Sequence, residues 1–337
     1  MQKNLRIAVL DDYLGIAMKC ADWSALAEDC AIECFTYHLG SADDVISELQ
    51  PFDIVCSMRE RTALPRSTLE KLPALKLVTV TGRECARLDV EAATELGIVV
   101  SNTTTRGPGG HGTAELTWAL ILSLARHVPW EAAAMRVGGW QRSLGTVLAE
   151  KTLGVIGLGT VGSRVASIGA AFGMNVIAWS PNLTDERART MGAVCVEKDE
   201  LFRRSDFVTL HLALGERTRH IVRRREIALM KPSAYFVNTA RAELLEPNAL
   251  LESLQHGSIS GAALDVFEDE PLADDDPLRG LQNVVLTPHL GYTVNERMRD
   301  YYVDTVENVI AFVRCSPIRV MNPSVLQARS LRAAVAM

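Results

Sequence analysis

A glycine-rich turn between two different hydrophobic patterns is the feature that most constrains this 337-residue chain. The turn reads Gly157-Leu158-Gly159-Thr160-Val161-Gly162. A strand-like apolar run, 153–156, leads into it, and a segment with helical spacing, 160–172, follows it. Glycines at these positions permit a tight turn, the close approach of a ligand to the backbone, and close helix–strand packing. The pattern predicts a strand–turn–helix unit whose helix N-terminus binds dinucleotide phosphates.

Short apolar runs that predict strands alternate with helical patterns along the whole chain, which is typical of parallel sheets with helices on both faces. The expected strands are residues 7–10, 32–37, 54–58, 77–81 and 98–101, then 153–156, 176–179, 194–196, 207–211, 234–237, 262–265 and 284–287. The expected helices are residues 42–49, 90–96, 113–127, 160–172, 247–256 and 295–314.

A glycine-rich break at 105–112 separates the two series of strands, and the amphipathic segment 295–314 follows the second series without a strand partner. We therefore predict two α/β domains. Residues 105–291 form a domain inserted into a first domain of residues 1–104 and 292–337. After the helix 113–127 we expect a less regular stretch to 150, and residues 324–337 form a mobile or docking tail.

Composition excludes several classes of protein. The net charge of −6 argues against a general nucleic-acid binder. The longest apolar run, 116–125, is too short to cross a bilayer, and the N-terminus enters a strand without a signal peptide. Seven scattered cysteines, none in a Cys-x-x-Cys pair, indicate free thiols in the cytoplasm. Histidines and cysteines do not cluster at metal-ligand spacing, so we expect no metal.

Three charged side chains follow the glycine turn in an order that indicates acid–base chemistry on a carboxylic acid. Arg241 comes directly after the predicted strand 234–237, and its planar guanidinium suits a carboxylate. His289 follows the last predicted strand, and imidazole readily moves a proton near neutral pH. An acid in the run 265–270 can orient such an imidazole and favour its protonated form. Glu268, Asp269 and Glu270 all compete for that role.

In this order the motifs resemble the D-isomer-specific 2-hydroxyacid dehydrogenase family. The likeness covers roughly residues 50–315 and rests on the glycine turn, 210–214 with Thr218, 238–241, 261–271 and 287–291. It implies two Rossmann-like parallel-sheet domains, with the cofactor domain inserted into a flavodoxin-like substrate domain. It also implies that Arg241 grips the substrate carboxylate, His289 donates and accepts the proton, and Glu270 supports His289.

The resemblance further implies which residues bind the nicotinamide cofactor, with Asp265 near its nicotinamide end. The expected set is Thr113, Gly157, Gly159, Thr160, Val161, Gly162, Ser180, Leu212, Thr218, Thr239, Arg241, Asp265 and His289. Ser180 replaces the acid that usually binds the adenosine ribose of NAD. The 2′-phosphate of NADP would therefore meet no carboxylate that repels it, and no nearby arginine that attracts it. We expect NAD and leave NADP open.

The part of the sequence expected to bind the substrate predicts its function less specifically. Residues 81–87 align with the family loop whose backbone amides bind the substrate carboxylate, which predicts contacts from Arg83, Glu84 and Cys85 in addition to Arg241. Further arginines stand nearby in the sequence, at Arg59, Arg61, Arg66 and Arg87. An anionic or phosphorylated substrate explains them, and so does an ordinary solvated face.

The motifs together predict an oxidoreductase that transfers a hydride between NAD(P)(H) and a small D-2-hydroxy acid or 2-oxo acid of the phosphoglycerate, glycerate/hydroxypyruvate or glyoxylate type. One rival is a non-catalytic NAD(H)-sensing binding protein of the corepressor type, which the complete Arg–Glu–His set disfavours. Another is a dehydrogenase for a substrate such as formate, which would need a different carboxylate site.

We also expect a homodimer. The helix 113–127 is apolar around most of its circumference and needs cover on nearly every side. The family resemblance implies that this helix forms the dimer contact. It also implies that the following stretch, with Trp130, Met135 and Trp140, reaches the partner.

Overall fold

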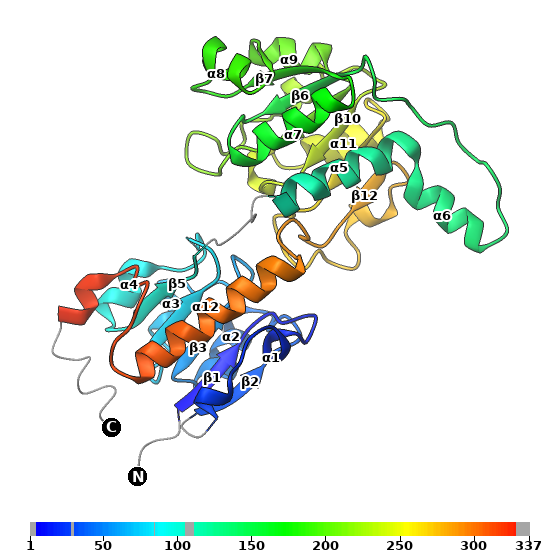
Figure 1. Cartoon of the computed structure of the whole chain (residues 1–337). Helices are drawn as coiled ribbons and strands as arrows, with labels where there is room; N and C mark the ends of the chain where they lie inside the picture. Colours follow the sequence, from blue (N-terminus) through cyan, green and yellow to red (C-terminus); the bar gives the residue numbers. More distant parts are fainter. Residues whose placement is uncertain (1–4, 28–29, 84, 105–110, 328–337) are drawn as a thin grey trace. The chain divides into compact units, whose positions relative to one another are not determined.

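The computed structural model describes residues 5–27, 30–83, 85–104 and 111–327, which fold into two compact α/β units (Figure 1). Unit 1 contains residues 1–109 and 295–337, and unit 2 contains residues 110–294. Each unit has its own parallel sheet, so the predicted fold class is confirmed.

The sheet of unit 1 has five parallel strands in the order β2-β1-β3-β4-β5, which is the flavodoxin-like order. The strands are β1 (Leu5–Val9), β2 (Cys30–Cys34), β3 (Ile54–Ser57), β4 (Leu77–Val80) and β5 (Val99–Asn102). Every residue of β3 and β4 is buried, as expected for central strands covered on both faces.

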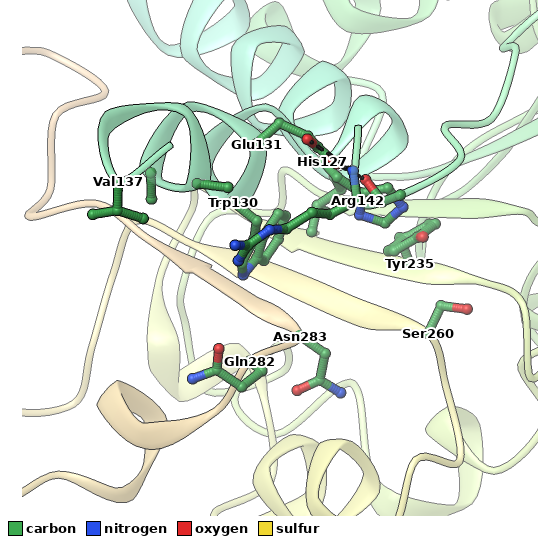
Figure 2. Close-up of a pocket in the computed structure, with 13 residues that line it drawn as sticks. His127, Trp130, Glu131, Val137, Arg142, Tyr235, Ser260, Gln282 and Asn283 are labelled. Carbon is green, nitrogen blue, oxygen red and sulfur yellow. Dashed lines mark hydrogen bonds between the residues drawn. The ribbon is translucent and has the colours of Figure 1, made fainter. Parts of the chain in front are cut away.

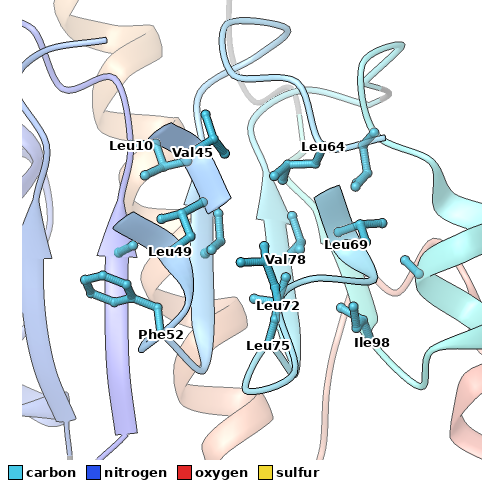
Figure 3. Close-up of a cluster of buried hydrophobic side chains, with 14 of the residues drawn as sticks. Leu10, Val45, Leu49, Phe52, Leu64, Leu69, Leu72, Leu75, Val78 and Ile98 are labelled. Carbon is cyan, nitrogen blue, oxygen red and sulfur yellow. The ribbon is translucent and has the colours of Figure 1, made fainter. Parts of the chain in front are cut away.

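Helices cover both faces of this sheet: α1 (Ala17–Cys20), α2 (Ala42–Leu49), α3 (Arg66–Leu69), α4 (Val90–Glu95) and α12 (Asn295–Val313). Ser41 caps α2 in a capping box with Asp44, which explains why this helix starts where predicted. Figure 3 shows Val45 and Leu49 of α2 packed with Leu69 and Val78 in the core of the unit. The helix α12, from the segment without a strand partner, contacts β4 and β5 and belongs to unit 1.

The sheet of unit 2 has seven parallel strands in the order β12-β11-β10-β9-β6-β7-β8. They are β6 (Thr152–Ile156), β7 (Asn175–Trp179), β8 (Val194–Cys195), β9 (Phe207–Leu210), β10 (Tyr235–Asn238), β11 (Gly261–Leu264) and β12 (Val284–Leu286). The strand order reverses between β6 and β9, and ligands of such sheets bind at this point, beyond the carboxyl ends of the strands.

Two hydrophobic clusters sandwich this second sheet. One contains residues of α5 (His111–Arg126) and α7 (Thr160–Ala171). The other contains residues of α9 (Lys198–Arg204), α10 (Arg224–Ile227) and α11 (Ala249–Gln255). The short helix α8 (Asp185–Thr190) follows β7 and is capped by Thr184. Helices on both faces leave only the strand ends open for function.

One sequence-based prediction about unit 2 was wrong. The stretch after residue 127 was expected to be less regular, but Val128–Arg136 forms the helix α6. Pro129 in its first turn and an alanine run favour the helix, while its exposed Val128 and Met135 hide the usual apolar periodicity. In the expected tail, residues 323–327 form the 3₁₀ turn η4 (Pro323–Gln327) with Val325 buried. Residues 328–337 lie outside the described residues.

Three other features concern membrane spans, disulfide bonds and metal sites. Within the described ranges, the helices are all too short or too polar to cross a membrane. All seven cysteines have free thiols. The same ranges contain no group of three or more His, Cys, Asp or Glu side chains arranged to hold a metal ion.

Candidate active site

The glycine turn is built by close backbone packing. Gly157 follows β6 with a φ of +96°, a conformation that favours glycine. A Cβ on Gly157 would lie 2.8 Å from the carbonyl carbon of His211, where the chain leaves β9. A Cβ on Gly162 would lie 2.0 Å from the carbonyl oxygen of Gly157. These two glycines therefore let β6, β9 and α7 approach one another, as the fingerprint predicts.

Gly159 has a different role, because a Cβ there would meet no atom within 4 Å. It is the N-cap residue of the 12-residue helix α7, which starts without a side-chain cap. The first N–H groups of that helix, beginning with Thr160 and Val161, have no partner within the helix and carry the positive end of its dipole. A bare backbone facing open space at an uncapped helix N-terminus fits the pyrophosphate of a dinucleotide.

Other predicted cofactor-binding residues follow neighbouring strands. Ser180 comes directly after β7, and its carbonyl oxygen accepts the N–H of Leu183 in a tight turn. Leu212 follows β9 and packs against the core. The hydroxyl of Thr218 donates to the carbonyl oxygen of Ala213 at 2.7 Å and accepts the N–H of Gly215 at 2.9 Å. Thr218 therefore shapes the loop after β9.

The Arg241 turn begins at the carboxyl end of β10. Asn238, the last residue of that strand, is fully buried. Its side-chain amide donates to the carbonyl oxygen of Arg241 at 3.0 Å, and its side-chain oxygen accepts the N–H of Ala240 at 2.9 Å. Thr239 lies inside this turn and contacts the hydroxyl of Thr117. The turn thus holds the backbone of Arg241 beyond the strand end.

The structure brings Glu270 and His289 together. His289 Nδ1 lies 2.7 Å from Glu270 Oε2, and both side chains are mostly buried. The other carboxylate oxygen, Oε1, accepts the N–H of Phe267 at 3.0 Å. Glu268 and Asp269 are exposed, so Glu270 is the acid of this loop that the structure pairs with His289. A partly buried pair is screened less by water than a surface pair.

The turn that carries His289 is held by Asp265, which follows β11 and is fully buried. One carboxylate oxygen, Oδ1, accepts the hydroxyl of Thr287 and the N–H of Leu290, both at 2.7 Å. The other, Oδ2, accepts the N–H of Gly291 at 2.9 Å. Burial raises the pKa of Asp265, although these hydrogen bonds and the nearby His289 oppose the change. A contact between Asp265 and a cofactor stays a prediction.

A second histidine, His211, also follows a strand of this sheet, but its chemistry differs. Its Nε2 lies 2.8 Å from the hydroxyl of Thr209. Burial lowers the pKa of His211 to about 3, so this imidazole is neutral at physiological pH. His289 is therefore the better candidate for a proton donor at this end of the sheet.

The predicted substrate loop belongs to unit 1. Arg83 is exposed, and its carbonyl oxygen accepts the side-chain amide of Asn102 at 3.1 Å. The buried thiol of Cys85 donates to the carbonyl oxygen of Arg59 at 3.3 Å, and burial raises its pKa. The side chain of Cys85 thus belongs to the core, and only its backbone remains a candidate for substrate binding. Glu84 lies outside the described residues.

Comparisons with known proteins agree with this arrangement. Residues 118–291 match the family model described as D-isomer specific 2-hydroxyacid dehydrogenase, NAD binding domain. The chain belongs to this family. It is 40% identical to a glyoxylate reductase of Aeropyrum pernix over 271 residues, which are 77% of this chain and 80% of that protein. A phosphoglycerate oxidoreductase structure from Vibrio cholerae, 34% identical, superposes with a TM-score of 0.87 over 92% of this chain and 99% of that one.

The chain spans about half the length of the D-3-phosphoglycerate dehydrogenases among its curated relatives. It is 42% identical to that of Methanocaldococcus jannaschii over 260 residues, which are 76% of this chain but 49% of that protein. Family membership assigns NAD as the cofactor of residues 118–291 and does not exclude NADP, because a more distant relative, 27% identical, is an imino acid reductase solved with NADPH.

Sequence reasoning missed one contributor to the site, Thr117. The helix α5 was read as an apolar element because most of its side chains are hydrophobic. The sequence did contain a sign of this contact, because two threonines stand four residues apart and therefore on one face of the helix. Polar side chains that are buried on such a face need hydrogen-bond partners.

Two glycine variants separate the roles of the turn. We expect Gly162→Ala to lower the free energy of unfolding by about 1–3 kcal/mol, because its Cβ overlaps the Gly157 carbonyl. Gly159→Ala should leave thermal unfolding unchanged, since its Cβ enters open space, but weaken NADH binding at least about tenfold. Calorimetric unfolding and NADH titration check both. Equal NADH affinity of Gly159→Ala and wild type would contradict the cofactor assignment.

A glutamine scan tests the choice of acid. With Glu270→Gln the His289 ring loses the carboxylate that contacts Nδ1. A neutral amide holds the ring less firmly than a carboxylate, so kcat for 2-oxo acid reduction should fall about tenfold or more in steady-state assays. Glu268→Gln is the matched control and leaves kcat unchanged. A loss of kcat with Glu268→Gln but not with Glu270→Gln would transfer the role to Glu268.

Proposed function

We propose that this chain is an oxidoreductase that transfers a hydride between a nicotinamide cofactor and a small D-2-hydroxy acid or 2-oxo acid. The observation that carries the proposal is the 2.7 Å contact between His289 and Glu270. It lies at the same sheet edge as the glycine turn and the Arg241 turn. Family membership and the names of the relatives support it.

The chemistry of the chain's own residues follows from this geometry. When bound, a nicotinamide ring supplies or accepts the hydride at the substrate's second carbon. Arg241 binds the substrate carboxylate with its planar guanidinium. Glu270 holds Nδ1 of His289, which leaves Nε2 to protonate the carbonyl oxygen in reduction and to take the hydroxyl proton in oxidation.

The substrate class is proposed from the relatives, which are named for phosphoglycerate, glyoxylate and hydroxypyruvate. The 2-oxo acids glyoxylate, hydroxypyruvate and phosphohydroxypyruvate, assayed with NADH and NADPH, and the 2-hydroxy acid 3-phosphoglycerate, assayed with NAD and NADP, test both the substrate and the choice of cofactor that Ser180 leaves open. Turnover of any of them excludes the alternative of a non-catalytic NAD(H)-sensing protein. The seven free thiols support a reducing cytoplasm as the location.

Removal of the proposed proton donor gives a direct test. We expect His289→Ala to lower kcat for 2-oxo acid reduction by about 10²–10⁴, the usual effect of losing a general acid, while the NADH dissociation constant changes little. His256→Ala is the matched control, because His256 is exposed and bonds only locally to the backbone of Glu252. Wild-type turnover by His289→Ala would contradict the assignment.

We also propose that the chain forms a homodimer through α5, α6 and the segment 137–148. The helix α6 projects outward from the sheet of unit 2, and this segment leads back from the end of α6 toward β6 (Figure 1). Its apolar side chains are between 73% and 94% exposed at Val137, Trp140, Leu144 and Val147. Such a concentration of exposed apolar side chains supports a protein interface rather than a free surface.

The groove beside this segment supports the same proposal. It has a volume of about 590 Å³ and lies between α6 and the amino ends of β10–β12. Figure 2 shows Trp130 and Arg142 on one side of it and Ser260, Gln282 and Asn283 on the other. A second copy of the segment 137–148 is its proposed occupant, because a two-fold interface places the same two surfaces against each other twice.

The assembly is tested by solution mass. We expect wild type to have twice the chain mass of 36.8 kDa at micromolar concentration, with an interface of about 2,000 Å² or more. The double variant Trp140→Glu and Leu144→Glu should be monomeric, because charges at both positions oppose apolar contact. Leu14→Glu, at an exposed apolar position of unit 1, is the matched control and stays dimeric. A wild-type chain that sediments at the mass of one chain overturns the proposal.

A further inference from the structure

Helix α5 presents two threonine hydroxyls to the two turns that carry Arg241 and His289. Thr113 and Thr117 are four residues apart and therefore lie on the same face of the helix. The other buried side chains of α5 are apolar: Ala114, Trp118, Leu120, Ile121, Leu124 and Ala125. The two hydroxyls are thus polar groups on the otherwise apolar inner face of α5, and both have partners outside the helix.

Thr113 holds the His289 turn. Its hydroxyl donates to the carbonyl oxygen of Gly291 at 2.9 Å. The N–H of the same glycine donates to Asp265, so Gly291 is bonded on both sides. A Cβ on Gly291 would lie 3.2 Å from the hydroxyl oxygen of Thr113 and 3.3 Å from Asp265 Oδ2, which shows how closely the turn is packed.

Thr117 holds the Arg241 turn. Its hydroxyl lies 2.8 Å from the carbonyl oxygen of Thr113 and 2.9 Å from the hydroxyl of Thr239. Since a hydroxyl has one proton and Thr117 donates it to the carbonyl, Thr239 must donate to Thr117. Thr117 is fully buried and Thr239 nearly so. Loss of the Thr117 hydroxyl would therefore leave a buried donor in the Arg241 turn without its partner.

The backbone of the His289 turn needs such support. His289 has a φ of +53°, a left-handed conformation that is uncommon for a residue with a side chain. A conformation of this kind persists where surrounding contacts hold it. Asp265 and Thr113 provide those contacts, while Asn238 and Thr117 hold the Arg241 turn.

We propose that Thr113 and Thr117 are positioning residues, and that the rigid turn of α5 between them fixes the separation between the Arg241 and His289 turns. The inference rests on the proposed roles of Arg241 and His289. A substrate whose carboxylate is held by Arg241 must place its carbonyl oxygen within hydrogen-bond reach of His289. Two strand-end turns bonded to one helix keep that distance constant.

Kinetics distinguish this role from a general effect on stability. Thr117→Val removes one hydroxyl at nearly constant shape and should raise KM for the 2-oxo acid about fivefold to tenfold, because the Arg241 turn shifts. Thr113→Val should instead lower kcat about fivefold to tenfold, because the His289 turn shifts. Thr113→Ser and Thr117→Ser keep the hydroxyls and should restore wild-type constants.

Thr94→Val is the matched control. Thr94 bonds the carbonyl oxygen of Val90 at 2.7 Å, four residues back along α4 of unit 1, as Thr117 does on α5. It should change neither kinetic constant. The proposal is overturned if Thr113→Val and Thr117→Val keep both kinetic constants within twofold of wild type. It is also overturned if the two variants lose activity only to the extent that they lose thermal stability, and Thr94→Val loses both to the same extent.

Amide hydrogen exchange gives a readout that needs no turnover. Thr113→Val should speed exchange about fivefold to tenfold in residues 287–293, and Thr117→Val should do so in residues 238–242, each without affecting the other turn. Unchanged exchange in both turns overturns the proposal. If wild type reduces no 2-oxo acid while the exchange pattern appears as expected, the proposed function fails and the positioning of the two turns stands.

Discussion

The parallel register of the unit 2 sheet is the constraint on which the site depends. The strands β6, β9, β10, β11 and β12 all run in one direction, so the residues that follow each of them emerge at the same edge. That edge receives the glycine turn, the Arg241 turn, Asp265 and His289, which are scattered over 130 residues of sequence. Their proximity follows from strand direction and order, because parallel strands place all their carboxyl ends together.

Polar groups at this edge are held by other buried polar groups. Asp265 and Asn238 are fully buried, and each satisfies two or more backbone or side-chain groups of the adjacent turns. An unpaired polar atom at such a position is costly, so each turn has few alternative arrangements. The same bonds explain how His289 keeps a left-handed backbone conformation, and why an apolar helix such as α5 contains two buried threonine contacts.

The sequence was most informative where a local pattern has a local physical cause. The capping box at Ser41 and Asp44 marks the start of α2, and the glycine fingerprint marks the start of α7. The helix α6 lacks such a local pattern, because it has no consistent apolar face, and a less regular stretch was expected there. Cys85 was placed with substrate-binding residues by alignment, whereas its thiol is buried in the core of unit 1. A resemblance in sequence does not show where each side chain points.

The sequence alone determined the two-series α/β architecture and the glycine turn, and it indicated Arg241 and His289 as candidate site residues, because periodicity, glycine spacing and residue chemistry are local properties. It left three neighbouring acids as partners for His289, and only the tertiary structure selected Glu270, by placing its carboxylate 2.7 Å from the ring. Tertiary structure also decided that Asp265, Thr113 and Thr117 contact the two turns. Those contacts join residues up to 178 positions apart, and no local pattern in the sequence encodes a distance between strand ends.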